Sequence, residues 1–203
     1  MGGKPRIESY SNLARRIAAR PAGRPRLVAV DGPGGAGKSV FAVRLAAALD
    51  QAPIVHTDDF ATGEPGDEWW PRLESQVIKP LSEAIPARYR RYDWHERELA
   101  EWHEVQPAPV VIIEGVSSAR RAVRDALASA IWVHAPRPIR LARGLDRDGE
   151  AARSDWARWM AEEDEHFRRD ATIKRCEVIV DGSPSISHDP EREFIWLGSC
   201  SYD

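Results

Sequence analysis

The sequence predicts an α/β fold in which helices cover both faces of a five-stranded parallel sheet. Short apolar segments alternate with stretches of helical spacing, which is the pattern of a parallel sheet. Residues able to do chemistry follow three of these segments directly, and the carboxyl ends of parallel strands share one edge, where ligands bind. The predicted strands are residues 26–30, 54–57, 110–113, 131–133 and 177–180.

Length and charge restrict the class of protein. The chain has 203 residues and a net charge of −3, which fits one domain and argues against a general nucleic-acid binder. No apolar run is long enough to cross a bilayer, and no apolar stretch follows the first residues as in a secretory signal. Cys176 and Cys200 are too few for a disulfide scaffold. We therefore expect a cytoplasmic protein with no membrane partner, for which an oligomer is compatible with the sequence but not indicated.

Helices and strands are expected to alternate in the N-terminal part of the chain. Residues 9–20 have the spacing of an amphipathic helix, which the Pro21–Pro25 stretch ends. The strand at 26–30, a glycine-rich loop and an alanine-rich helix at 40–49 follow, and the strand at 54–57 ends in the acidic turn Asp58-Asp59. Residues 69–85 are expected to form a helix interrupted at Pro71 and Pro80, because proline lacks the backbone donor.

The remaining elements complete the alternation. Residues 88–94 are expected to be extended or a hairpin, and a helix at 118–128 is expected between the strands at 110–113 and 131–133. Two helices, 138–147 and 152–167, lie on either side of Gly149. We divide the single domain into an N-terminal helix and linker (1–25), a core (26–182) with a lid at about 137–153, and a loop-like tail (183–203) with a short candidate strand at 194–197.

A glycine-rich loop is the most specific motif. Residues 32–39 read Gly-Pro-Gly-Gly-Ala-Gly-Lys-Ser, which matches G-x-x-x-x-G-K-[ST] between a strand and a helix. Backbone N–H groups of such a loop surround phosphates, the lysine neutralises them and the hydroxyl holds Mg²⁺. The motif predicts a nucleotide triphosphate site formed by Gly32, Gly34, Gly35, Ala36, Gly37, Lys38, Ser39 and Val40.

Carboxylates follow two other strands. Asp58 stands where it could accept the proton of an attacking hydroxyl, while Asp59 could orient a magnesium-bound water. Glu114, at the end of the strand 110–113, would be costly to bury without a cation, which Mg²⁺ would supply. The alternative is structural: a helix cap or acidic turn for Asp58, and a salt-bridged strand end for Glu114.

An arginine stripe follows the fourth strand. Arg137, Arg140, Arg143 and Arg147 are three, three and four residues apart, so a helix would carry them on one face. Their mutual repulsion is relieved by a polyphosphate, which predicts a lid over the transferring phosphate, with Arg153 as a further member. The alternative is a solvated face paired with Asp146 and Asp148.

The segment 88–95 is rich in stacking and hydrogen-bonding groups, including Tyr92 and His95. It is equally consistent with an acceptor site and with a surface hairpin that buries aromatic side chains. The Trp69-Trp70 pair is expected in the core or at a domain contact, and the histidines show no metal-ligand spacing.

These motifs together resemble the uridine kinase-like group of P-loop nucleoside and metabolite kinases, over about residues 26–182. The resemblance implies a P-loop NTPase fold with strand order 2-3-1-4-5 and transfer of phosphate from MgATP to a substrate hydroxyl. It implies Asp58 as the base, Glu114 near magnesium, and Arg143 and Arg147 as lid arginines, in addition to Lys38 and Ser39 from the loop motif and Asp59 from the acidic turn. It also implies an acceptor site that includes Asp58, Phe60, Tyr92, His95 and Glu114.

The chain departs from the family pattern on the acceptor side. Ala61 stands where family members have a tyrosine, His95 lies three rather than five residues after Tyr92, and Val40 replaces a second hydroxyl residue. Reaction type therefore carries over better than substrate. We expect a small-molecule kinase that uses ATP and Mg²⁺ on a nucleoside-like acceptor. The alternatives are a kinase of another hydroxylated metabolite or antibiotic, and a non-catalytic nucleotide-binding regulator.

Overall fold

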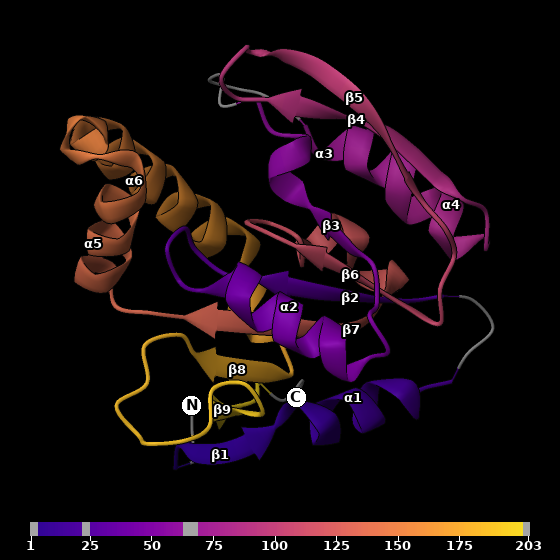
Figure 1. The fold of residues 1–203 in the computed structure, drawn as a ribbon, viewed down its shortest axis with the longest axis horizontal. Helices are drawn as coiled ribbons and strands as arrows, with labels where there is room; N and C mark the ends of the chain where they lie inside the picture. The colour runs from indigo at the N-terminus through magenta and orange to yellow at the C-terminus, as the bar shows by residue number, and fades with distance from the viewer. Residues whose placement is uncertain (1–3, 22–24, 63–68, 201–203) are drawn as a thin grey trace.

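A seven-stranded mixed sheet forms the centre of the molecule in the computed structural model, which describes residues 4–21, 25–62 and 69–200 (Figure 1). The strand order is β1-β9-β8-β7-β2-β6-β3. Their bounds are β1 Arg6–Ser9, β2 Arg26–Asp31, β3 Ile54–His56, β6 Val110–Glu114, β7 Leu127–His134, β8 Val178–Asp181 and β9 Glu193–Gly198.

The five predicted strands form the parallel part of this sheet. β2 pairs with β6 and β7, β3 pairs with β6, and β8 pairs with β7, all in parallel. Counted along the chain, these five strands lie in the order 2-3-1-4-5. The ends of β2, β3 and β6 therefore meet at one edge, which is where the predicted site residues lie.

Two antiparallel strands extend the sheet beyond its five parallel strands, and one of them, β9, confirms the candidate strand predicted at 194–197. β9 pairs with β8 on one side and with β1 on the other. The expectation of a purely parallel sheet is thus incomplete, and the segment after residue 183 is more than a loop-like tail. β1 has only four residues and exposes its first two, so it carries too little apolar pattern to be recognised.

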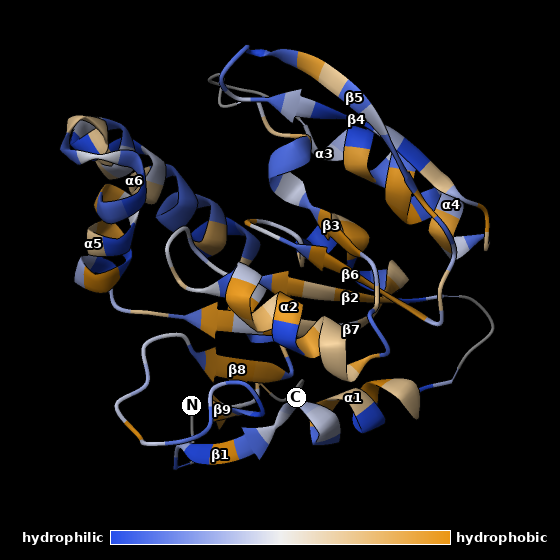
Figure 2. Ribbon diagram, viewed as in Figure 1, coloured by the Kyte–Doolittle hydropathy of each residue, from blue (hydrophilic) through white to orange (hydrophobic). Residues whose placement is uncertain are grey.

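Helices cover the sheet on both faces. α2 (Lys38–Ala48) and α1 (Tyr10–Ala18) pack against each other and enclose one apolar cluster with Val28, Val30 and Ile112 of the sheet. The strands of the sheet are mainly hydrophobic, whereas α5 (Arg137–Asp148) and α6 (Arg153–Asp170) are mainly hydrophilic (Figure 2). Both were predicted, with α6 ending three residues later than expected.

The helix predicted at 118–128 is wrong. Residues Arg121–Ala126 form a short 3-10 turn, and β7 begins at Leu127. Pairing of Leu127 with Leu27 of β2 overrides the local helical preference, because a paired strand satisfies its backbone groups within the sheet.

A separate two-stranded lobe stands over the β3 side of the sheet (Figure 1). It consists of β4 (Ala87–Asp93), β5 (Glu98–Val105) and an interrupted helix made of α3 (Trp70–Leu73), a π-helical turn (Glu74–Ile78) and α4 (Lys79–Ser82). Their apolar side chains join Leu27, Val55 and Val111 in a second cluster. The lobe is thereby fixed beside the end of β3.

Among the residues that the structure describes, no helix combines the length and the apolar character needed to cross a membrane.

Candidate active site

The phosphate loop connects β2 to α2 and is closely surrounded. Gly35 has φ +74°, and a Cβ at this position would lie 2.5 Å from the carbonyl oxygen of Arg140 in α5. Gly37 has φ +99° and precedes the first turn of α2 in the left-handed conformation. Both positions require glycine, so the motif is used for its backbone geometry and leaves N–H groups at the helix N-terminus for an anion.

Lys38 lies inside the loop. It is only 8% exposed, and its Nζ donates a hydrogen bond to the carbonyl oxygen of Pro33 at 3.1 Å. Ser39 and Val40 are exposed at the start of α2, whereas Ala36 is fully buried. The ammonium group of Lys38 is therefore held within the loop, where a phosphate-binding lysine must lie.

Asp58 occupies a short 3-10 turn directly after β3. Desolvation and the negative charge of Glu114 raise the pKa of Asp58, while the positive charges of Lys38, His56 and Arg147 act in the opposite direction. A carboxylate with a raised pKa is a stronger base, and this one lies within the electrostatic reach of the loop lysine. The positive charge of Lys38 thus acts on the sequence-predicted Asp58.

Glu114 ends β6 and is 5% exposed. One of its oxygens, Oε2, lies 2.7 Å from Nδ1 of His56, and this hydrogen bond raises the pKa of His56. The parallel register pairs His56 with Glu114, so the contact follows from the sheet itself. The histidines, His56 among them, show no metal-ligand spacing in the sequence, but the position of His56 two residues before Asp58 was a usable signal.

The turns after β3 and β6 are in direct contact. Gly115 has φ +139°, and a Cβ there would collide with the Thr57 side chain. Glycine at 115 therefore allows Glu114 to approach the turn that carries Asp58.

Asp59 points to the hairpin lobe. Its Oδ2 accepts a hydrogen bond of 2.8 Å from the Tyr89 hydroxyl, and Tyr89 in turn packs against Phe60 with ring centroids 4.7 Å apart. Phe60, predicted on the acceptor side, is 0% exposed. Phe60 belongs instead to the apolar cluster that fixes the lobe.

The hairpin reaches the site through Trp94, which sequence reasoning did not separate from its neighbours. Its Nε1 donates to the backbone carbonyl of Asp58 at 3.0 Å, and its side chain stays 45% exposed. Tyr92 packs edge-on against this ring and is itself buried. His95 lies in the hairpin turn with a side chain that is 94% exposed and pairs with Glu96.

The four arginines of the stripe have different partners. Arg143 donates to the carbonyl oxygens of Gly35 and Gly182 at 3.1 and 2.9 Å, so it lies against the phosphate loop. Arg147 pairs with Asp148 at 2.7 Å. Arg137 pairs with Asp164, and Arg140 is 5% exposed near Glu163 and Asp164 of α6. Arg143 thus contacts the phosphate loop and Arg140 approaches α6, whereas Arg147 has the Asp148 partner of the solvated-face alternative.

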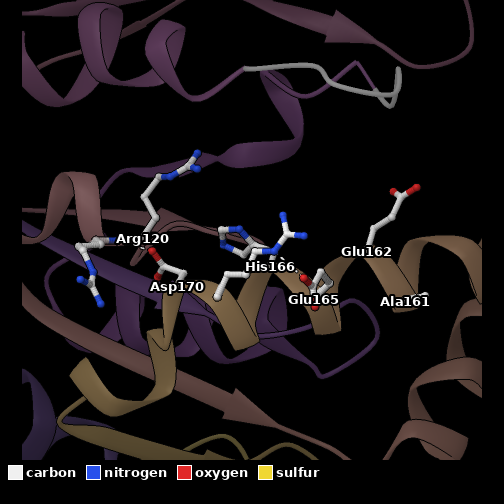
Figure 3. Close-up of a pocket in the computed structure, with 8 residues that line it drawn as sticks. Arg120, Ala161, Glu162, Glu165, His166 and Asp170 are labelled. Atoms are coloured by element: carbon white, nitrogen blue, oxygen red, sulfur yellow. Dashed lines mark hydrogen bonds and ion pairs between the residues drawn. The ribbon is translucent and has the colours of Figure 1, made fainter.

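A cavity of about 820 Å³ lies alongside α6 (Figure 3). The wall opposite the helix includes Arg120, whose guanidinium lies 4.7 Å from the Trp70 ring centre. The lining contains both arginines and carboxylates, and His166 faces the interior. Its residues are Arg120, Arg121, Ala161, Glu162, Glu165, His166, Arg169 and Asp170.

The parallel sheet, the phosphate loop and the carboxylates at one edge define a P-loop phosphotransferase. The model of the phosphoribulokinase/uridine kinase family matches residues 55–155, from β3 into the first turn of α6. The match and the fold together support a uridine kinase-like P-loop kinase.

Two solved structures share the fold. A protein of Bacillus stearothermophilus, provisionally named a uridine kinase, is 20% identical with a TM-score of 0.63, over 84% of this chain and 96% of that one. A protein of Silicibacter sp. TM1040, provisionally named a fructose transport system kinase, is 22% identical with a TM-score of 0.63, over 80% and 95%. No protein with a curated description matches the sequence.

Proposed function

We propose that the protein transfers the γ-phosphate of MgATP to a hydroxyl group of a nucleoside-like acceptor. The observation that supports this most directly is the place of Asp58, on the turn directly after β3 and beside the turn after β6, where the positive charge of Lys38 acts on it. A site that only senses nucleotide has no use for a base on the acceptor side. Asp58 takes the proton of the acceptor hydroxyl, the oxygen attacks the γ-phosphorus, and ADP leaves.

The phosphate loop and the arginines bind the nucleotide. Backbone N–H groups of residues 34–39 hold the phosphates, and Lys38 exchanges the Pro33 carbonyl for phosphate oxygens. Arg143 already lies on the loop, so a small movement would bring its guanidinium to the transferring phosphate. The positive charge of Arg147 acts to lower the pKa of Asp58, and Arg147 completes the proposed lid over residues 137–153.

The donor set fits Mg²⁺ held mainly by phosphate. Among the residues described, no group of three or more His, Cys, Asp and Glu side chains forms a metal cluster. Mg²⁺ retains several waters and takes one or two protein ligands besides substrate phosphates, which suits Ser39 with Glu114 and, through water, Asp59. When bound, the ion would neutralise charge that develops on the phosphate oxygens.

A flat aromatic surface favours a nucleoside-like acceptor. Trp94 is half-exposed directly beside Asp58, and a planar base could stack on it while its sugar hydroxyl faces the carboxylate. Tyr92 supports this ring from the side, and His95 would have to turn inward from solvent to take part.

Other acceptors are a second candidate. Ala61 stands where uridine kinase-like proteins carry a tyrosine, so the side chain that would define a nucleoside pocket is missing. The similar Silicibacter protein bears the name of a fructose transport system kinase. A sugar, another hydroxylated metabolite or an antibiotic would use the same base and phosphate loop. A regulator that binds ATP without transfer remains the alternative from a different class.

The test is ATP consumption by the purified protein against a panel of nucleosides, sugars and aminoglycosides, with the Asp58→Asn variant as control. Acceptor-dependent ADP release that requires Asp58 supports the proposal. ATP binding with no acceptor-dependent turnover across the panel would favour the regulator.

A further inference from the structure

One acidic side chain of α6 reaches into the phosphate loop. Both carboxylate oxygens of Glu163 accept the backbone N–H of Gly34, at 3.0 Å from Oε2 and 3.2 Å from Oε1. The side chain is 16% exposed. Nothing in the sequence motif anticipates this contact, because the two residues are 129 positions apart.

The surroundings of this carboxylate are those of a phosphate. The guanidinium of Arg140 lies 3.7 Å from Oε2, and the positive charges of Lys38 and Arg140 act on Glu163. A loop N–H, the loop lysine and an arginine of α5 thus converge on one anionic group. The same three kinds of group stabilise the terminal phosphate of a bound nucleotide.

Two anions cannot share this position. A terminal phosphate near Lys38 would stand beside Glu163, and like charges at such a distance in a partly buried site repel strongly. We infer that Glu163 lies where the terminal phosphate of a nucleoside triphosphate would bind, and that the triphosphate must displace it. This inference rests on the proposed function, since it requires ATP to bind in the loop.

Displacement has a cost for affinity that depends on the nucleotide. Only the molecules in which Glu163 has left the Gly34 N–H can bind triphosphate there. The apparent affinity for triphosphate is therefore lowered by the fraction of molecules in that state. A diphosphate held by Lys38, Ser39 and the N-terminus of α2 leaves Gly34 free, so it is little affected. Glu163 therefore acts as a specificity-determining residue that lowers ATP affinity relative to ADP and keeps α6 against the loop when the site is empty.

The experiment is calorimetric titration of the full chain with MgATP and with MgADP. Glu163→Gln retains the shape but weakens the acceptor, because hydrogen bonds to charged groups are stronger than neutral ones. We expect this variant to bind MgATP about fivefold to tenfold more tightly than the wild type, with MgADP changed by less than about twofold. Glu163→Ala, which removes the acceptor altogether, should show at least the same gain.

The matched control is Glu162→Gln, which removes the same charge one residue earlier on α6, from the cavity wall. It should leave both affinities unchanged, and melting temperatures identify any variant that fails to fold. Equal or weaker ATP binding by both folded Glu163 variants would overturn the inference alone. Absence of ATP binding in every protein, wild type included, would overturn the proposed function and this inference with it.

Discussion

The carboxylate of Asp31 accepts the backbone N–H of Ala119 at 2.8 Å, and so joins the end of β2 to the turn after β6. Its other oxygen accepts the N–H groups of Gly32 and Ser117 at 2.7 and 2.9 Å. Asp31 is fully buried. One side chain thus fixes the start of the phosphate loop relative to the segment that follows Glu114.

This arrangement predicts a pH-dependent stability. Burial raises the pKa of Asp31 to about 7, against the opposing effect of the three N–H donors. Between about pH 4 and 7 the unfolded chain loses the proton of this group while the folded chain keeps it, so its contribution to stability falls as pH rises. Below that window both states are protonated and the contribution is fully present.

The measurement is the free energy of unfolding in urea from pH 5 to 8 for the wild type, Asp31→Asn and Asp50→Asn, the last being an exposed carboxylate. Asp31→Asn should lack this decline and should cost about 1–3 kcal/mol near pH 5, because its amide keeps only one acceptor oxygen and at least one of the three buried N–H groups loses its acceptor. A wild-type advantage over Asp31→Asn that stays constant across this range would contradict the prediction.

Lys38→Ala should abolish activity and weaken ATP binding while the protein stays folded. Lys38 is a cation held inside the loop, where its Nζ donates a hydrogen bond to the carbonyl oxygen of Pro33. Lys79→Ala on the exposed side of α4 provides the control for loss of a lysine. Normal ATP turnover by a folded Lys38→Ala protein would show that the loop at residues 32–39 is not the nucleotide site.

Asp58→Asn should leave ATP binding nearly unchanged and lower kcat by about 10²–10⁴-fold, the usual contribution of a positioned base. Asp59→Asn should be milder and partly rescued by higher magnesium concentration. Its amide still accepts the Tyr89 hydroxyl, so the hairpin lobe stays in place. A near-normal rate for Asp58→Asn beside an inactive Asp59→Asn would assign the base to the other carboxylate.

Arg143→Ala should lower kcat more than it alters ATP affinity, because its contact with phosphate strengthens as charge develops in the transition state. Its present partners, the carbonyls of Gly35 and Gly182, can be satisfied by water. Arg158→Ala, an exposed arginine of α6 paired with Asp155, is the control. Protease protection of residues 137–153 should increase only with ATP and acceptor together. If Arg143→Ala has the kcat of the wild type and ligands do not change protease protection of residues 137–153, the arginine stripe has only a structural role.

Trp94→Leu should raise KM for a planar acceptor by about 3- to 10-fold with little change in KM for ATP, which matches the energy of one aromatic stacking contact. Trp102→Leu on the same hairpin is the control. That ring is also exposed, and the guanidinium of Arg88 lies 4.4 Å from its centre. Equal KM values in both variants would show that the acceptor does not use the Trp94 ring.

The sequence by itself determined the reaction class and most of the parallel sheet. The phosphate loop is a local motif, and its chemistry depends on glycines, a lysine and a hydroxyl that are consecutive in the chain. The apolar strands and the carboxylates that follow them are likewise local patterns, and the rule that parallel strands end at one edge brings Asp58 and Glu114 to the loop.

Tertiary structure alone decided which long-range partners these residues have. Glu163 on Gly34, His56 on Glu114, and Trp94 on the Asp58 carbonyl each join segments that no local spacing relates. The burial of Phe60 and the antiparallel addition of β1 and β9 have the same origin, as does the replacement of the predicted helix at 118–128. The physical reason is that packing and backbone pairing between distant segments contribute more free energy than the local preferences from which a sequence is interpreted.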